Sequence, residues 1–258
     1  MDARHPDTCA VILDQGNQRI IEIRKTVLIN QITRDADRIA KSFDELHGSD
    51  LEIISKQFAL TVALTTSGML KATQDGDDLR IACGELLSNS LNSLAAATYM
   101  LRGGFILQPG SVIRSSFESL AVVLHLVQFQ ADLASHRCDK FDSTRAIASA
   151  KRVFPPFGKM YGLLSKEFTH IGQLHRQITP IREYTASCEP LTLNLHFITA
   201  GVWMCHVTSE LAFLDAVAKP RYWTQLPVES SDQVAYCYSP SAEEQAWMET
   251  FLGMASVP

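Results

Sequence analysis

The sequence lacks the short motifs that identify most catalytic folds. It has no G-x-S-x-G, which excludes a nucleophile elbow. It also has no P-loop, no G-x-G-x-x-G and no H-E-x-x-H, the usual phosphate, dinucleotide and zinc-protease signatures. Lys and Arg form no run, and the net charge of -5 argues against general nucleic-acid binding, which usually leaves a basic footprint. Function has to be inferred from patterns of polar residues instead.

Paired cysteines and a leader segment are also lacking. The six cysteines stand singly, without a C-x-x-C pair. No basic segment followed by an apolar stretch opens the chain, so we expect no signal peptide. Both features predict free thiols in a cytoplasmic protein. Cys83 and Cys205 fall in apolar helical patterns, where cysteine usually acts as a small core residue.

What the sequence does have is helical periodicity over most of its 258 residues. We predict an all-α, multi-helix bundle with a long central apolar helix and a short irregular segment at 221–239. Residues 1–76 form N-terminal helices that act as a packing or dimerisation appendage, and residues 77–258 form the bundle core. The expected helices cover 18–47, 50–72, 77–101, 109–135, 142–155, 157–175, 191–219 and 242–252.

Two of these helices need comment. The helix over 18–47 is amphipathic and is expected to end at Gly48-Ser49-Asp50. The helix over 191–219 contains an uncharged stretch, Leu191 to Ser209, that is long enough to span a bilayer. It contains His196 and His206 among other polar residues, which are costly in lipid. We therefore predict a buried bundle helix and no membrane association.

The helix that begins at Pro109 is apolar except along one stripe. Arg114 and Glu118 are four residues apart and share a helix face, and His125 follows seven residues after Glu118 on that face. Charges in so apolar a helix are expected to be paired, because an unpaired buried charge is costly. The stripe is consistent with a cleft in which Arg114 holds an anion, and also with an ion pair that ties two helices together, which is the favoured interpretation.

Two further clusters have the residue types of metal ligands. Glu167 and His170 form a Glu-x-x-His unit, the spacing that supplies di-iron sites in helical bundles. His206 and Glu210 lie one turn apart on the long helix, as metal ligands or as a base with its orienting carboxylate. The structural alternative is core histidines whose ring nitrogens bond to hydroxyls and carbonyls, and it is favoured.

Three segments resemble a known pattern. They are Tyr99-Met-Leu-Arg102-Gly-Gly-Phe, Arg114-Ser-Ser-Phe-Glu118 and Tyr161-Gly-Leu-Leu-Ser165-Lys-Glu-Phe-Thr-His170. Over residues 80–215 the chain resembles an uncharacterised family of bacterial all-helical proteins, which is similar in turn to the HEPN (higher eukaryote and prokaryote nucleotide-binding) bundles of toxin and phage-defence systems. The residues that match are Arg102, Arg114, Glu118, Ser165 and His170.

The resemblance implies a catalytic role for Arg114, Glu118 and His170. It also implies ligand binding by Arg102 and Ser165. His125, which lies on the polar stripe of the helix that begins at Pro109, is a further candidate ligand-binding residue. Catalytic HEPN ribonucleases carry a histidine five to seven residues after an arginine, and no arginine here is followed in that way.

Three hypotheses follow. The first is a HEPN-like protein of undefined activity, with a polar cleft around Arg114, Glu118 and His170 for a nucleotide or RNA, no cofactor, and a homo-oligomeric state. The second is a metal-dependent enzyme that uses Glu167, His206 and Glu210. The third is a non-catalytic protein that dimerises through the 18–47 helix.

Overall fold

The computed structural model describes residues 6–169, 172, 174–176, 180–226 and 235–251, which fold into a mostly helical protein. Besides the helices it has two small antiparallel hairpins, each of two strands. The longer helices are α2 (Ala36–Asp75), α3 (Asp78–Arg102), α4 (Pro109–Gln128) and α8 (Glu189–Ala212). The shorter ones are α1 (Val27–Ile32), α5 (Leu133–Arg137), α6 (Ser143–Val153), α7 (Pro155–Leu164) and α9 (Ala242–Phe251).

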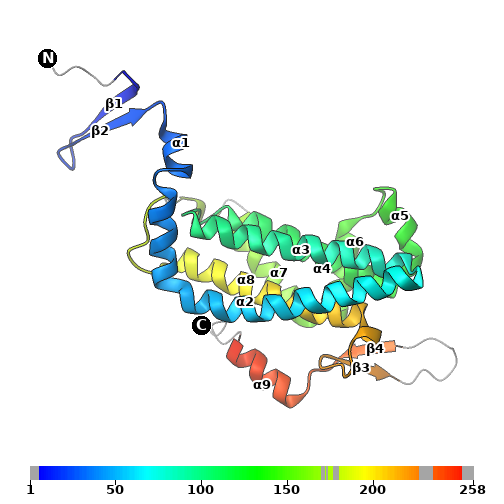
Figure 1. Cartoon of the computed structure of the whole chain (residues 1–258). Helices are drawn as coiled ribbons and strands as arrows, with labels where there is room; N and C mark the ends of the chain where they lie inside the picture. The colour runs from blue at the N-terminus through cyan, green and yellow to red at the C-terminus, as the bar shows by residue number, and fades with distance from the viewer. Residues whose placement is uncertain (1–5, 170–171, 173, 177–179, 227–234, 252–258) are drawn as a thin grey trace.

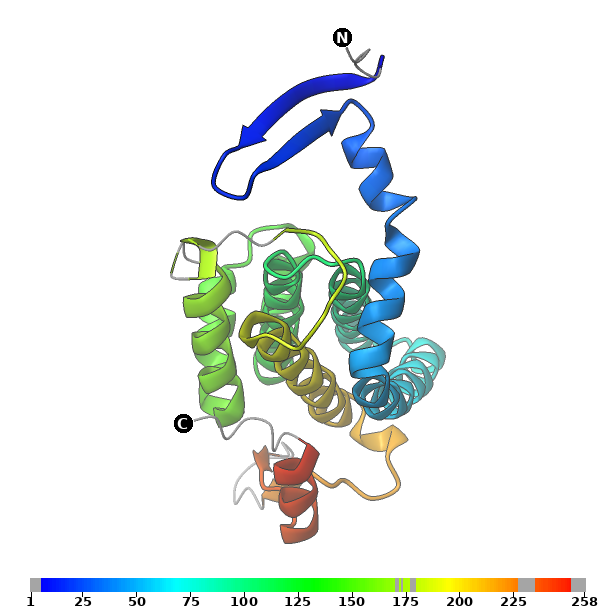
Figure 2. The ribbon, with the colours of Figure 1, turned by 90° about the vertical axis from the view of Figure 1, so that its left-hand side faces the viewer.

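Helix α8 is the centre of the bundle. It contacts α2, α3, α4 and α7, and its side chains are buried around most of its circumference. Figure 1 shows α2, α3 and α8 running alongside one another, and Figure 2 shows the bundle nearly end-on. A helix that is apolar on all sides has to be surrounded in this way, so the prediction of a long central apolar helix is confirmed, although it ends at Ala212 rather than at 219.

Helix α2 corrects the predicted break at Gly48-Ser49-Asp50, because it continues without interruption from Ala36 to Asp75. The helix nevertheless changes direction in its first third (blue in Figures 1 and 2). Glycine–serine pairs are among the few causes of sharp helix bends, and Gly48-Ser49 lies in that part of the helix. The helix thus continues through the residues that were expected to end it.

The N-terminal segment corrects the predicted helix over 18–47. Strands β1 (Thr8–Asp14) and β2 (Arg19–Arg24) form a hairpin, followed by the short helix α1. Asp14 organises the turn: its carboxylate accepts hydrogen bonds from the Asn17 side chain (2.9 Å) and from Arg19 Nε (2.7 Å). Short apolar runs do not distinguish a strand from a helix by periodicity alone.

The C-terminal part corrects a second expectation. The segment predicted as irregular forms a hairpin of β3 (Trp223–Leu226) and β4 (Ala235–Tyr238). Two other helices are shorter than predicted. Helix α4 ends at Gln128 rather than at 135, and α7 ends at Leu164, where a π-helical turn covers Ser165–Thr169.

Several predicted helix starts are confirmed at atomic detail. The carboxylates of Asp77 and Asp142 accept hydrogen bonds from the backbone N–H groups of Arg80 (3.0 Å) and Thr144 (2.9 Å). The Ser241 hydroxyl accepts one from the Glu244 N–H (3.2 Å). Each cap satisfies a backbone donor that the helix itself leaves unpaired.

The predicted division at residue 76 falls at the turn between α2 and α3, where Gly76 ends α2 in the left-handed conformation. Helix α2 nevertheless packs along α3 and α8 and contributes Phe43, Ile54 and Ala72 to the core. The predicted two-part organisation stays a prediction.

Within the described residues one helix, α4, is long and apolar enough to cross a bilayer, and 61% of its apolar window is buried inside the protein. Burial of this kind is typical of a core helix.

Candidate functional sites

Arg114 and Glu118 are paired with each other on α4, as the sequence predicts. Arg114 Nε donates to Glu118 Oε1 at 2.9 Å, and the hydroxyl of Tyr161 on α7 donates to the same oxygen at 3.1 Å. The two charged side chains are 32% and 37% exposed, so the pair lies at the surface rather than in the core. Both alternatives for the stripe remain open, since the pair ties α4 to α7 and also faces solvent.

A second cation joins this cluster from α6. The guanidinium carbon of Arg114 lies 5.7 Å from the centre of the Tyr161 ring, and Lys151 Nζ lies 5.9 Å from it. Burial and the nearby Glu118 carboxylate raise the pKa of Tyr161. The cluster thus holds two cations beside the Tyr161 ring, one of which is paired with the Glu118 carboxylate. We refer to Arg114, Glu118, Lys151 and Tyr161 as the Arg114 cluster.

His125 does not belong to that cluster. Its ring is fully buried, with Nδ1 2.9 Å from the Ser149 hydroxyl and Nε2 2.8 Å from Asp132 Oδ2. Arg145 pairs with the same carboxylate at 3.2 Å. Both ring nitrogens are thus engaged, and the contacts join the end of α4 to α6. His125 has the surroundings of a structural residue.

Arg102 is also engaged elsewhere. Its guanidinium donates two hydrogen bonds to Asp44 on α2, at 2.8 and 2.6 Å, which fixes the end of α3 against α2. The Arg102 hydrogen bond lowers the pKa of Asp44. These bonds use two of the five N–H donors of the guanidinium, so the predicted ligand binding by Arg102 stays a prediction.

The segment after α7 is described in part. The Ser165 hydroxyl is buried and has no hydrogen-bond partner among the described residues. Glu167 pairs with the adjacent Lys166 at 3.3 Å. His170 lies outside the described residues, so its predicted catalytic role stays a prediction.

His206 and Glu210 each contact a different partner. His206 Nδ1 is 3.3 Å from the Thr61 hydroxyl on α2. Glu210 Oε1 accepts the backbone N–H groups of Arg221 and Tyr222, both at 2.8 Å. Burial lowers the pKa of His206 to about 4, and burial raises the pKa of Glu210 despite these hydrogen bonds. The contacts agree with the structural alternative, in which His206 is a core histidine bonded to a hydroxyl.

Glu167 is far from these two residues. The neighbour of Glu167, Phe168, packs edge-on against Phe197 on α8. Phe197 lies 13 residues before Glu210 on the same helix, which separates the two by about 20 Å along the helix axis. Among the residues that the structure describes, no three His, Cys, Asp or Glu side chains gather closely enough to hold a metal ion.

A groove that the sequence did not reveal lies at the other end of α8. It is open, has a volume of about 830 Å³, and is lined among others by Arg80, Leu211, Asp215, Trp223, Gln225 and Tyr236. Asp215 pairs with Arg80 and, at 2.7 Å, with Lys71. Arg80 also lies 3.7 Å from Asp75, so each of these charged side chains has a partner of opposite charge among the described residues.

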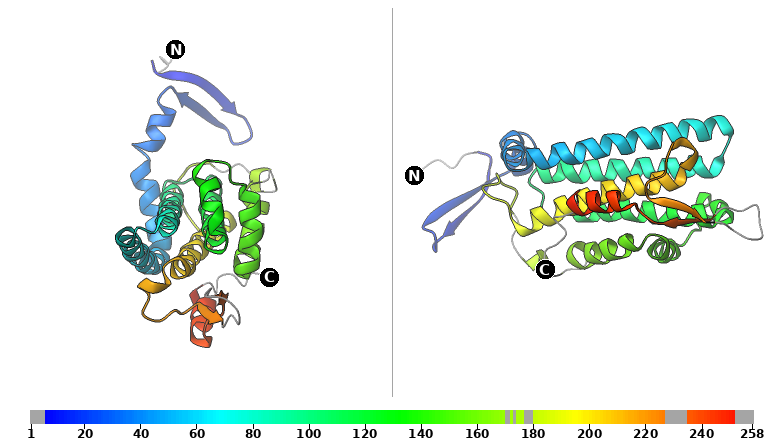
Figure 3. Two further views of the ribbon diagram at one scale, coloured as in Figure 1. Left: turned by 90° about the vertical axis from the view of Figure 1, so that its right-hand side faces the viewer. Right: turned by 90° about the horizontal axis from the view of Figure 1, so that it is seen from below.

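The most unusual surface is the N-terminal arm, by which we mean residues 7–32. It projects away from the bundle in all views (Figures 1, 2 and 3). Nine of its large aliphatic side chains are between 37% and 70% exposed. They are Val11, Ile12, Leu13, Ile20 and Ile21 in the hairpin, and Val27, Leu28, Ile29 and Ile32 in and beside α1. Two apolar runs around Gly16-Asn17 were the signal for this hairpin.

No model of a known protein family matches the chain, and comparisons with curated proteins and with solved structures returned no significant match.

Proposed function

We propose that this chain is an interaction protein, and that its N-terminal arm docks against a protein surface. The observation that carries the proposal is the run of nine exposed aliphatic side chains on a projecting element. Scattered surface leucines are ordinary, but contiguous exposed apolar surface on a folded protein marks an interaction site.

The hairpin also carries apolar side chains on both of its faces, as strands do when other parts of a protein pack against both faces of their sheet. Successive residues of a strand point to opposite faces, so the run Ala10-Val-Ile-Leu13 places apolar side chains on both. Ile12 pairs with Ile21 on one face, and Leu13 pairs with Ile20 on the other. Strands buried on both faces read as continuous apolar runs, and an isolated two-stranded hairpin is only marginally stable in water. The arm therefore gains most of its stability when a partner covers it.

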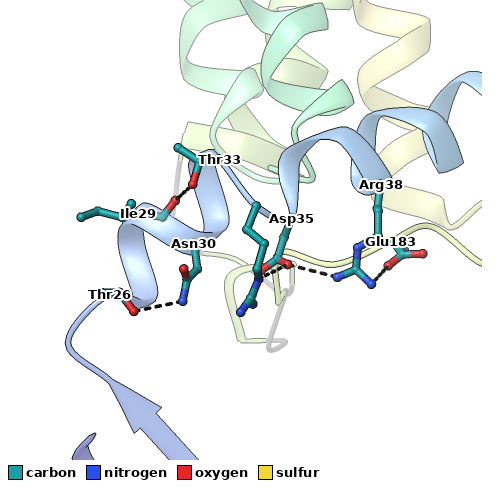
Figure 4. Close-up of polar contacts among 8 residues, drawn as sticks. Thr26, Ile29, Asn30, Thr33, Asp35, Arg38 and Glu183 are labelled. Atoms are coloured by element: carbon teal, nitrogen blue, oxygen red, sulfur yellow. Dashed lines mark hydrogen bonds and ion pairs between the residues drawn. The ribbon is translucent and has the colours of Figure 1, made fainter. Parts of the chain in front are cut away.

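The root of the arm is held in place by polar contacts, which Figure 4 shows. Asn30 Nδ2 donates to the Thr26 hydroxyl (3.1 Å), and the Asp35 N–H donates to the Asn30 carbonyl (2.9 Å). Arg38 donates to Asp35 (3.0 Å) and pairs with Glu183 (3.3 Å). The Asp35–Asn30 bond links α1 to the start of α2, and the Arg38–Glu183 pair links the start of α2 to the segment before α8.

Site-specific photo-crosslinking in cells that express the chain tests the proposal. A photoreactive residue at Leu13, in the arm, is compared with one at Leu163, which is 49% exposed on α7. We expect an adduct from position 13 that disappears when Leu28→Asp is added, because a charge on the arm opposes its burial. Equal labelling from both positions, or an adduct indifferent to Leu28→Asp, contradicts the proposal.

The Arg114 cluster supports a second candidate function, a HEPN-like bundle that binds a nucleotide or RNA phosphate. Arg114 and Lys151 converge from α4 and α6 on Tyr161, and Arg114 keeps about a third of its side chain exposed. Titration with nucleotides and with a short single-stranded RNA is the test. We expect Arg114→Ala to weaken binding at least tenfold, while Arg137→Ala, which removes another paired surface arginine, leaves it unchanged. Absence of binding to the wild-type protein contradicts this function.

A further inference from the structure

We infer that the partner of the arm is the arm of a second copy of this chain, and that the two copies pair through the edges of their β1 strands. The resulting sheet has four antiparallel strands. The inference rests on the proposed interaction function and adds the identity of the partner.

The two edges of the hairpin are not equivalent. Strand β2 carries three charged residues, Arg19, Glu22 and Arg24, and charged side chains are a common protection of strand edges. Strand β1 is uncharged from Cys9 to Leu13 and has its only charge, Asp14, at the turn. Of the two edges, β1 is the one without this protection, and an unpaired edge strand is a template for another strand.

A twofold axis makes β1 complementary to itself. Two antiparallel copies centred on Ile12 place Ile12 opposite Ile12 of the second copy, and Val11 opposite Leu13. Each of these cross-strand pairs is apolar, and such pairs stabilise an antiparallel sheet. Twofold symmetry is the commonest arrangement of homo-oligomers and requires a patch of this self-complementary kind.

Charge and size also fit a second copy. Residues 7–32 contain three acidic residues (Asp7, Asp14, Glu22) and three basic ones (Arg19, Arg24, Lys25), so the arm has no net charge and two arms do not repel each other. A stable interface takes about 20–30 residues from each partner, so most of the arm, and not the seven residues of β1 alone, has to be buried in the dimer. Continuing from the hairpin, α1 adds Leu28, Ile29 and Ile32 to the apolar surface.

The oligomeric state of the purified full chain is the first test, measured by light scattering across a hundredfold range of concentration. We expect a dimer for the wild-type protein, and at least a tenfold weaker association for Ile12→Asp and for Leu28→Asp. Leu70→Asp, at a residue 62% exposed on α2 and outside the arm, is the matched control and should remain dimeric. Circular dichroism of each variant shows whether the bundle is still folded.

Cysteine crosslinking tests the strand edge itself. In a background where the exposed cysteines 9, 138, 188 and 237 are serine, cysteine is placed singly at Val11, Ile12 and Leu13. Directly opposed residues in an antiparallel pair lie at distances that a disulfide spans. We therefore expect Ile12→Cys to form a reducible dimer in preference to its two neighbours.

The outcomes separate the inference from the function on which it rests. A monomeric wild-type protein at all concentrations overturns the inference, and so does a dimer that Ile12→Asp and Leu28→Asp leave intact. If the crosslink from Leu13 in cells then joins the arm to a different protein, the interaction function holds and the second copy is the wrong partner. If no arm-dependent crosslink forms at all, both fail.

Discussion

At the scale of single residues, several buried polar side chains of α8 bond to hydroxyls and backbone groups, whereas Asn194 Oδ1, His196 Nε2, Trp203 Nε1 and Thr208 Oγ1 have no partner among the described residues. Thr61 faces His206, and the hydroxyls of Thr65 and Ser209 lie 2.9 Å apart, so a polar seam runs between α2 and α8. The Ser90 hydroxyl lies 2.6 Å from the Ser116 hydroxyl in the same way. Buried polar groups that are each satisfied stabilise one arrangement of the helices over others.

This seam makes stability depend on pH. The pKa of His206 is lowered to about 4 by burial and by the Arg221 charge, whereas in the unfolded chain it is near 6.5. The unfolded chain therefore binds the proton first, and stability decreases as pH falls from about 6.5 towards 4, by at most about 1.4 kcal/mol per pH unit. We expect His206→Gln to flatten this decrease in urea denaturation at pH 7.0, 6.0 and 5.0. Parallel pH profiles of the variant and the wild-type protein would contradict it.

Glu210 is a second buried polar residue of α8 with a measurable role, outside the seam. Its carboxylate accepts the N–H groups of Arg221 and Tyr222, which secures the chain just before β3. Glu210→Ala leaves these donors without a partner, at a cost of about 1–3 kcal/mol. We expect that loss in the free energy of unfolding, and a smaller one for Glu210→Gln, which keeps an acceptor oxygen. An alanine variant within about 0.5 kcal/mol of the wild type would show that water replaces the carboxylate.

Sequence reasoning worked at this scale where the pattern is local. The helices predicted to begin at 77, 142 and 242 begin within one residue of these positions, and their caps Asp77, Asp142 and Ser241 bond to N–H groups only two or three residues further along the chain. The partners of Arg102 and His206 come from other helices, at Asp44 and Thr61. No single sequence reveals such pairings, because they depend on which helix faces which.

At the scale of elements, the close contact between α2 and the segment after α8 depends on one glycine. A Cβ atom at Gly68 would lie 2.1 Å from Cγ of Phe213, whereas a Cβ at Gly48, in the same helix, meets nothing within 4 Å. Both Gly→Ala changes gain the same helix propensity, so the difference between their effects on the free energy of unfolding reports the contact with Phe213.

We expect Gly68→Ala to destabilise the protein by about 1–3 kcal/mol through overpacking. Gly48→Ala is expected to stabilise it by about 0.5–1 kcal/mol. The free energy of unfolding in urea, measured on both variants, checks the pair. Equal effects at the two positions would show that Phe213 moves aside at little cost.

Element type could be predicted wherever a periodic run was long, as in α3, α4 and α8. The hairpins were missed because their strands are short: Ile20 and Ile21 of β2 fit a helical spacing with Val27 and Leu28 as well as they fit a strand. The turn at Gly16-Asn17 carries the deciding information, and the Asp14 contacts show why the chain reverses there.

At the scale of the whole molecule, the bundle and the arm differ in how their apolar surface is treated. Helix α8 buries nearly all of its surface, whereas the arm leaves nine large aliphatic side chains exposed. Composition could not separate these cases, since apolar residues in a bundle core and on a docking element are the same residues. Only their placement in the fold distinguishes them, and the structure supplies that placement.

This difference predicts how thermal stability responds to concentration. If two arms stabilise each other only when copies associate, unfolding releases separate chains, and mass action raises the Tm as protein concentration increases. For a chain of this size we expect roughly 1–3 °C for each tenfold increase. Leu28→Asp should have a lower Tm that no longer depends on concentration, because its chains unfold as monomers. Leu70→Asp should keep the wild-type dependence, since its side chain lies on α2, away from the arm. Scanning calorimetry over a hundredfold range of concentration measures both quantities, and a wild-type Tm that is constant over that range would show that the bundle gains nothing from a second copy.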